Sequence, residues 1–381
     1  MQTAEFLDMK NKISPTELEA IVRHHVSLIA EQPSLSAQLP PLMVWGGPGL
    51  GKSTILRKVA EEAGIGFIDI RLAQREPVDI RGLPVPSEDS VSWLISSDWP
   101  RDPNSRGILL FDELTAADRS LQVAAYEIIL DRRLGDLYHL PEGWYIVAAG
   151  NREEDMAVSM TMSSALANRF MHAELQESAE EWVRWGLQNS IHPAVIGFIR
   201  FRPDLLFHQK NENLERGWPT PRSWERVSTL MHNFHIDDMP HLLDKMIFGL
   251  VGNQAGIEFL AFKEIASKFD DAYELMTNSN RKISIPEKPD QRYAFCAAVA
   301  YHLWRGKTPE EEQKLLSGFY RIAMELPSDF ATMLMMDALT GNRKNEDSSV
   351  FADKLYNHKS YSKWAEKHGK AMRARICVKG L

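Results

Sequence analysis

The chain has 381 residues, 44% of them hydrophobic and 25% charged, which indicates a folded globular protein of about two to three domains and excludes a mainly disordered chain. The net charge of −8 gives no general reason to expect nucleic-acid binding. Two cysteines are too few for a disulfide scaffold, no apolar run approaches the ~18 residues that span a bilayer, and no signal segment is visible at the N-terminus, so we expect a cytoplasmic protein without a membrane partner.

The first predicted element is a helix that begins after Ser14. This residue can cap the helix, Pro15 fits its first turn, and Glu17 completes a capping box. Apolar residues follow at helical spacing, namely Leu18, Ile21, Val22, Val26 and Ile29. We assign residues 1–34 to this N-terminal helical segment.

Residues 35–177 alternate short apolar runs with helical stretches, the pattern of an α/β core with a parallel sheet. The predicted strands are the five apolar runs at 42–45, 67–70, 108–111, 144–149 and 170–175. Helices are predicted at 52–63 and 120–133. Residues 76–106 contain five prolines and break the alternation, so we expect an insert of loops and short elements in an otherwise five-stranded sheet.

The remaining chain is predicted to be helical. A helical lid is expected over 178–277 and, beyond a polar segment with two prolines, a helical region over 291–381. From residue 351 onward, eight Lys and Arg face two acidic residues. This basic tail could contact phosphate or an acidic partner, or it could be a solvated helix face or a contact to the acidic body of the protein.

A phosphate-binding loop of the Walker A pattern G-x-x-x-x-G-K-[ST] lies between the first strand and the next helix. Glycines let backbone N–H groups surround an anion, and the N-terminus of a helix favours negative charge. The predicted nucleotide-binding residues are Gly46, Gly47, Pro48, Gly49, Leu50, Gly51, Lys52, Ser53 and Thr54. Lys52 is expected at the β- and γ-phosphates and Ser53 at Mg²⁺, so ATP and Mg²⁺ are the predicted cofactors. The alternative is a chance glycine turn.

Polar side chains end two later strands. Asp112 and Glu113 follow a fully apolar strand, as in a Walker B motif. We expect Asp112 to hold Mg²⁺ through water and Glu113 to orient and polarise the attacking water. Asn151 follows another strand and could bind the γ-phosphate or that water, or it could simply cap a turn, and the next residue, Arg152, is interpreted as structural.

Together these motifs resemble the AAA+ ATPases, specifically the MoxR branch with an insertion in helix 2. Segment 165–170 resembles the arginine-finger motif L-D-R-F, with Asn168 in place of the acid, and segment 219–223 resembles the sensor-2 motif. Segments 71–84 and 140–144 resemble the corresponding segments of the subgroup that is often encoded beside a von Willebrand A-type protein. The resemblance covers roughly residues 35–235.

The resemblance implies further roles. Arg169 would reach the γ-phosphate of a neighbouring subunit, with Arg132 or Arg133 as alternatives, and Arg222 would bind the γ-phosphate of its own subunit. A finger supplied by a neighbour implies a homo-oligomeric ring, most commonly a hexamer. In the insert, Trp93 with Val91 and Leu94 could bind a polypeptide or a partner, or Trp93 could pack on its own subunit. The subgroup resemblance separately implies a possible von Willebrand A-type protein partner.

The predicted function is therefore that of a ring ATPase that hydrolyses ATP to remodel or activate a protein client. The alternatives are a motor that depends on nucleic acid, favoured by the basic tail, and a nucleotide-gated scaffold with little turnover, disfavoured by the intact Glu113. His24, His25, His172 and His192 have no metal-ligand spacing with one another and are expected to be structural.

Overall fold

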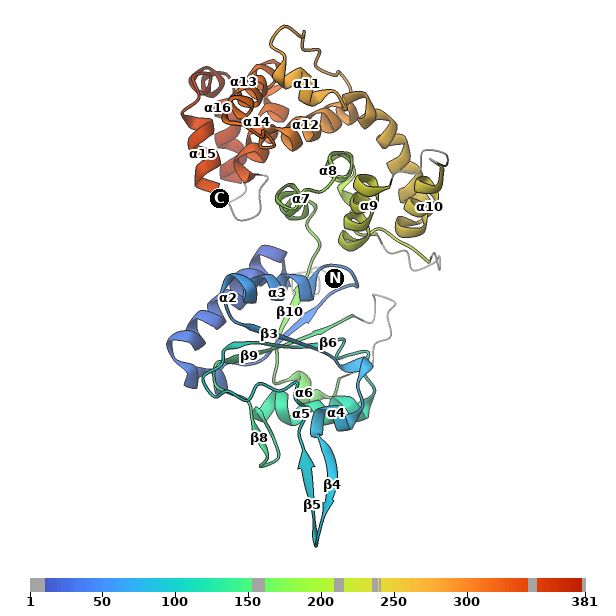
Figure 1. Cartoon of the computed structure of the whole chain (residues 1–381), viewed down its shortest axis with the longest axis vertical. Coiled ribbons are helices and arrows are strands. Elements are labelled where there is room, and N and C mark those ends of the chain that lie inside the picture. The colour runs from blue at the N-terminus through green and yellow to red at the C-terminus, as the bar shows by residue number, and fades with distance from the viewer. Residues whose placement is uncertain are drawn as a thin grey trace, which may run out of the picture. The chain divides into compact units, whose positions relative to one another are not determined.

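The structure, a computed structural model, describes residues 11–152, 162–208, 216–234, 239, 241–341 and 348–378. The chain divides into two compact units, Met1–Ser178 and Ala179–Leu381 (Figure 1). No helix within the described ranges is long and apolar enough to cross a membrane.

The first unit is built on a parallel sheet of six strands in the order β1-β10-β2-β9-β6-β3. The strands are β1 (Lys12–Ile13), β2 (Leu42–Trp45), β3 (Gly66–Arg71), β6 (Gly107–Asp112), β9 (Trp144–Gly150) and β10 (Met171–Leu175). The predicted α/β fold with a parallel sheet is confirmed. The expectation of five strands was wrong, because β1 adds a sixth strand beside β10. Two residues are too few to show a strand periodicity in the sequence.

The order of the strands decides which loops meet. Because all six are parallel, their carboxyl ends lie along one edge of the sheet, where ligands of open α/β sheets bind. Strand β9 lies between β2 and β6. The loops that follow β2, β9 and β6 are therefore neighbours at this edge.

Helices cover both faces of the sheet. Figure 1 shows α2 and α3 on one face and α4, α5 and α6 on the other. Their bounds are α2 (Pro15–Glu31), α3 (Lys52–Glu62), α4 (Pro77–Arg81), α5 (Arg119–Asp131) and α6 (Ser164–Ala167). The predicted capping box at Ser14 and Glu17 is present. Strands β2, β6 and β9 are almost completely buried between these layers, as their continuous apolar runs predict.

The insert contains α4 and a β-hairpin that projects away from the sheet (Figure 1). Its strands are β4 (Leu83–Ser87) and β5 (Ser90–Leu94). Trp93 on this hairpin is 42% exposed, whereas Trp99, after the hairpin, is buried against Phe111 and Tyr138. The remaining short elements of this unit are η1 (Pro33–Ala37), η2 (Leu72–Gln74), β7 (Arg133–Leu134) and β8 (Tyr138–His139).

The second unit is helical in its described part. It comprises α7 (Ala179–Gln188), α8 (Pro193–Phe201), η4 (Pro203–Leu205), α9 (Pro221–Asn233), α10 (His241–Ala266), η5 (Ser267–Phe269), α11 (Ala272–Thr277), α12 (Pro289–Leu303), α13 (Pro309–Glu325), α14 (Ser328–Thr340), α15 (Ser348–Tyr356) and α16 (Tyr361–Val378). One hydrophobic cluster runs from Trp182 to Trp364, so the predicted lid and the predicted C-terminal region both contribute to it. Helix α10 is kinked at Gly252, where φ is +77°.

Candidate functional site

The glycine-rich loop adopts the strand–loop–helix arrangement that its motif requires. Strand β2 ends at Trp45, and α3 begins at Lys52. Gly49 and Gly51 have φ angles of +85° and +91°, in the left-handed region that glycine adopts without strain. Gly51 also occupies the N-cap position of α3. The loop therefore delivers the chain directly to the N-terminus of a helix, where an anion is favoured.

The Lys52 ammonium connects this loop to Asn151. Its Nζ atom donates to the carbonyl oxygen of Gly47 at 3.1 Å and also to that of Gly46. It is 3.3 Å from Oδ1 of Asn151, at the end of β9. Two residues 99 positions apart in the sequence thus lie in hydrogen-bond contact, and a positive charge faces neutral oxygen acceptors that a phosphate can replace.

Asn151 is held in place by groups that the sequence did not identify. Its backbone N–H donates to the Thr115 hydroxyl at 3.2 Å, and that hydroxyl is 3.3 Å from the Asn151 carbonyl oxygen. Thr115 is only 1% exposed. A Cβ on Gly150 would lie 2.7 Å from Cε of Met43 and 2.8 Å from the Thr115 hydroxyl, so only glycine fits there. A glycine at the end of an apolar strand was the available signal.

The two carboxylates follow β6 at the same edge of the sheet. The Asp112 carboxylate accepts the backbone N–H of Glu113 at 2.9 Å. Glu113 has a φ of +56°, which is uncommon for a residue with a side chain, and backbone of this kind is enriched at functional sites. The N–H of Leu114 donates to the Ala149 carbonyl at 2.9 Å. This bond ties the turn that carries both acids to β9, next to Asn151.

A third acid, Asp69 on β3, lies close to these carboxylates. Burial raises its pKa, and the negative charge of Asp112 raises it further. Arg57 of α3 forms an ion pair with Asp69 at 3.6 Å. Sequence analysis missed Asp69 because it stands inside an apolar strand rather than at its end.

The donor groups at this edge suit Mg²⁺. Magnesium prefers one or two carboxylates with substrate phosphates and water rather than a cage made of protein side chains. Asp112 and Ser53 offer a carboxylate and a hydroxyl, both partly exposed. No cluster of three His, Cys, Asp or Glu side chains with metal-binding geometry occurs among the described residues.

Arg169 lies at the opposite edge of the sheet from this loop. It stands two residues before β10, which runs parallel to β2, so it is at the amino ends of the strands. Its side chain is exposed and makes no hydrogen bond or ion pair with any residue that the structure describes. Arg169 therefore cannot reach the phosphate loop of its own first unit.

The two alternatives to Arg169, which are Arg132 and Arg133, both contact groups of their own chain. Burial lowers the pKa of Arg132 to about 10, and its guanidinium donates to the carbonyl oxygens of Pro141 and Trp144 at 3.0 and 2.8 Å. Arg133 pairs with Glu127 and Asp136 at 3.7 Å each. Arg132 is thus bound to the backbone of its own chain, whereas Arg133 is exposed and paired only at the surface. Arg152 pairs with Glu174 of β10, in keeping with its structural interpretation.

Arg222 belongs to the second unit, at the second position of α9. Thr220 and Ser223 form a capping box that fixes this helix start, with Thr220 N–H donating to Ser223 Oγ at 2.7 Å and Ser223 N–H donating to Thr220 Oγ1 at 3.0 Å. The Arg222 side chain is exposed. Within the described residues it has no hydrogen-bond or ion-pair partner.

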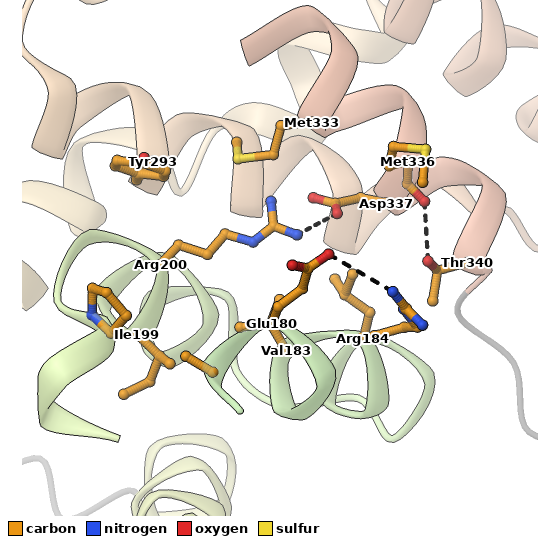
Figure 2. Close-up of a pocket in the computed structure, with 13 residues that line it drawn as sticks. Glu180, Val183, Arg184, Ile199, Arg200, Tyr293, Met333, Met336, Asp337 and Thr340 are labelled. Carbon is orange, nitrogen blue, oxygen red and sulfur yellow. Dashed lines mark hydrogen bonds and ion pairs between the residues drawn. The ribbon is translucent and has the colours of Figure 1, made fainter. Parts of the chain in front are cut away.

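The second unit also contains a pocket of about 220 Å³ between α7, α8 and α14 (Figure 2). Arg200 forms an ion pair with Asp337 inside it, and Glu180 lies 3.7 Å from Arg184. Met333, beside Arg200 in Figure 2, is among its apolar lining residues. These two cations and two anions have no net charge together.

Comparison with known proteins gives distant structural likenesses. No protein-family model and no curated protein sequence matches the chain. A putative ATPase from Cytophaga hutchinsonii is 14% identical, with 85% of this chain and 94% of that chain covered and a TM-score of 0.31. The Thermotoga maritima RuvB Holliday junction branch migration motor is 15% identical, with 76% and 89% covered and a TM-score of 0.33. NtrX from Brucella abortus, solved with ADP, is 14% identical, with 95% and 68% covered and a TM-score of 0.30. Likenesses at this level do not establish a shared family.

Proposed function

We propose that the chain binds ATP with Mg²⁺ and hydrolyses it to ADP and phosphate, as an ATPase of the AAA+ type. The observation that carries this proposal is the contact of Lys52 Nζ with Asn151 Oδ1 at 3.3 Å. It brings the phosphate loop and the strand-end amide together at one sheet edge. The adjacent strand of that edge ends in Asp112 and Glu113.

Each group at this edge has a defined role in phosphoryl transfer to water. Lys52 neutralises charge on the β- and γ-phosphates, and Ser53 and Asp112 hold Mg²⁺, which supplies further positive charge there. Glu113 orients and polarises the attacking water, and Asn151 aligns that water or the γ-phosphate. Catalysis of this kind depends on positioning and charge rather than on covalent chemistry.

We infer that hydrolysis requires a neighbouring subunit. Arg169 is exposed at the sheet edge opposite the phosphate loop, so a second copy must supply the finger to each site. A repeated head-to-tail contact of this kind gives a ring if the rotation between copies closes and a helical filament if it does not; we propose a ring, most commonly a hexamer. Arg222 would bind the γ-phosphate from the second unit and report its loss after hydrolysis.

The finer assignment is a MoxR-type ATPase that remodels or activates a protein client. The projecting β4–β5 hairpin supports it, because Leu83, Val91, Trp93 and Leu94 are each 42–61% exposed, and apolar side chains gathered on a protruding element favour a protein contact. A von Willebrand A-type protein is the proposed partner.

Substitution of Glu113 tests the proposed chemistry. Glu113→Gln keeps the size of the side chain but removes its negative charge, so ATP binding is expected to persist while turnover falls by about 10²-fold or more. Lys52→Ala is expected to abolish ATP binding. Glu61→Gln, on the exposed surface of α3, is the matched control and should leave both unchanged. Near-normal turnover of the Glu113 variant would remove this residue from the mechanism.

The alternative of a nucleic-acid motor rests on the basic tail. Two lysines of this tail already have partners within the second unit. Lys354 pairs with Glu312 at 2.8 Å, and Lys367 donates to the Met324 carbonyl at 2.5 Å. Stimulation of turnover by DNA, with binding that weakens steeply with salt, would favour the motor. Negligible turnover in the assembled state would instead favour a nucleotide-gated scaffold.

A further inference from the structure

We propose that His172 is a positioning residue for Arg169. It holds the turn that carries this arginine in place and connects the turn to β2, the strand that leads into the phosphate loop. The inference rests on the proposed function, because it assumes that Arg169 acts on the site of a neighbouring subunit. Arg169 is exposed and has no partner among the described residues, yet a finger must be held accurately to act.

The backbone on both sides of Arg169 is anchored. The Phe170 N–H donates to the Ala167 carbonyl at 3.2 Å, which closes a turn around Asn168 and Arg169. Phe170 itself is buried, and the next N–H, from Met171, donates to the Pro41 carbonyl at 2.9 Å. Only the side chain of Arg169 is therefore left to project from a fixed turn.

His172 contacts this turn at two places. Its Nε2 atom lies 2.8 Å from the Ala167 carbonyl oxygen, the same oxygen that closes the turn. Its ring lies edge to face with Phe170, with centroids 6.2 Å apart. One imidazole thus holds the carbonyl that begins the turn and packs on the side chain that ends it.

The other ring nitrogen of His172 is bound to Trp45, the last residue of β2. The register pairs His172 with Met43, so His172 and Trp45 lie on the same face of the sheet as a diagonal pair. Trp45 Nε1 donates to His172 Nδ1 at 2.9 Å, and the two ring planes are nearly parallel, 19° apart, with centroids separated by 6.0 Å. Trp45 immediately precedes Gly46, whose carbonyl accepts from Lys52.

These bonds fix the chemical form of the imidazole. An indole N–H can only donate, so Nδ1 of His172 must be the acceptor and carry no proton. Nε2 then carries the proton and donates it to the Ala167 carbonyl. A replacement must offer an acceptor and a donor at the same time to keep both contacts. Glutamine can do so through its amide, whereas phenylalanine can fill the space but makes neither bond.

A mixture of two variants separates the two sides of the subunit interface. Glu113→Gln subunits supply a finger but do not hydrolyse, and Arg169→Ala subunits have an intact site but no finger. Turnover in mixed oligomers then comes from Arg169→Ala sites next to Glu113→Gln neighbours. His172→Phe is added either to the finger-supplying chain or to the site-supplying chain, so both mixtures contain the same number of substitutions. Thermal unfolding of each double variant checks that it folds.

We expect His172→Phe to lower turnover by up to about 10²-fold when it is in the finger-supplying chain, the scale of a small misplacement of a catalytic group, and to have little effect in the other chain. His172→Gln in the finger-supplying chain should restore most of the turnover. An equal loss in both placements would indicate a general structural role and overturn the inference, and so would no loss in either. No turnover in the parent mixture would overturn the proposed finger in trans, and the role of His172 with it.

Discussion

Thr115 holds the backbone of Asn151 in place, although no motif names it. It is buried and its hydroxyl contacts both the N–H and the carbonyl of Asn151. Thr115→Val keeps the shape but removes both hydrogen bonds, so we expect the Asn151 amide to shift from the attacking water. Turnover should fall by about 10-fold or more, while ATP affinity changes little, because Lys52 and the loop are untouched.

The matched variant for this prediction is Thr115→Ser, which keeps the hydroxyl and should retain most of the turnover. Steady-state hydrolysis and nucleotide-binding titration measure the two quantities separately. If the valine variant lost affinity and turnover in equal proportion, Thr115 would support the whole site rather than Asn151 alone.

The positions of single residues could be predicted where a motif places the residue at the end of a strand or at the start of a helix. Lys52, Asp112, Glu113 and Asn151 each stand at the end of a strand or the start of a helix, and parallel pairing brings such ends together. The residues that support them were not predictable. Thr115 and His172 act through contacts with residues 36 and 127 positions away in the sequence, and no local pattern marks such contacts.

At the scale of elements, α13 and α11 approach so closely that a glycine is required between them. A Cβ on Gly318 would lie 2.1 Å from the Met276 carbonyl oxygen, so the helices must move apart in Gly318→Ala. We expect the free energy of unfolding to fall by about 1–3 kcal/mol, the usual cost of overpacking. Denaturant unfolding of the full chain measures it.

The control for this change is Gly369→Ala in α16. There the nearest atom to the added Cβ is that of Ala365, at 4.0 Å, so the methyl group meets open space. Alanine is favoured over glycine inside helices by up to about 1 kcal/mol, so this variant should be as stable as the parent or more so. An equal loss of unfolding free energy in both alanine variants would show that the close approach of α11 and α13 is not the cause of the destabilisation in Gly318→Ala.

We expect the second unit to lose stability in acid because a histidine, His192, caps the start of α8. His192 caps this helix, its Nδ1 accepting from Ala194 N–H at 3.2 Å. Burial, with a smaller effect of the neighbouring His232, lowers its pKa from 6.5 to about 4. Between these values the unfolded chain binds a proton that the folded chain does not, so stability is lost as the pH falls from about 6.5 to about 4.

His192→Asn tests this, because asparagine can also cap a helix but does not titrate in this range. Between pH 6.5 and pH 4 the variant should lose up to about 3 kcal/mol less unfolding free energy than the parent, at about 1.4 kcal/mol per pKa unit. Unfolding curves recorded across this range provide the comparison. Identical pH dependence in the two proteins would rule out His192 as the titrating group.

Elements were predictable in proportion to their length and periodicity. The buried strands and the helices α2, α3 and α5 lie where apolar runs and caps place them, within one or two residues. Strand β1 and the β4–β5 hairpin were not identified as strands. The first has two residues, and the second contains Pro84 and Pro86, which are unusual within a sheet.

At the scale of the molecule, the parallel sheet places the groups of the proposed reaction at its two opposite edges. The phosphate loop, the carboxylates and Asn151 lie at the carboxyl edge, and Arg169 lies at the amino edge. On the proposed mechanism, a single first unit therefore lacks a finger for its own site and carries one that it cannot use itself. Stacking such units edge to edge completes every site with the same contact, which is the physical reason to expect assembly before turnover.

Complementation between inactive subunits tests this arrangement. Lys52→Ala removes nucleotide binding but leaves Arg169, and Arg169→Ala removes the finger but leaves the site, so each variant alone should be inactive. Mixed oligomers should regain part of the parent turnover, because a Lys52→Ala subunit completes the site of its Arg169→Ala neighbour. The effect of an arginine finger, about 10³–10⁵ in rate, makes even partial rescue measurable. Turnover is followed as the ratio of the two chains is varied, with mixing verified by differential tags. Inactivity at every ratio in confirmed mixed oligomers would mean that Arg169 does not act across the interface.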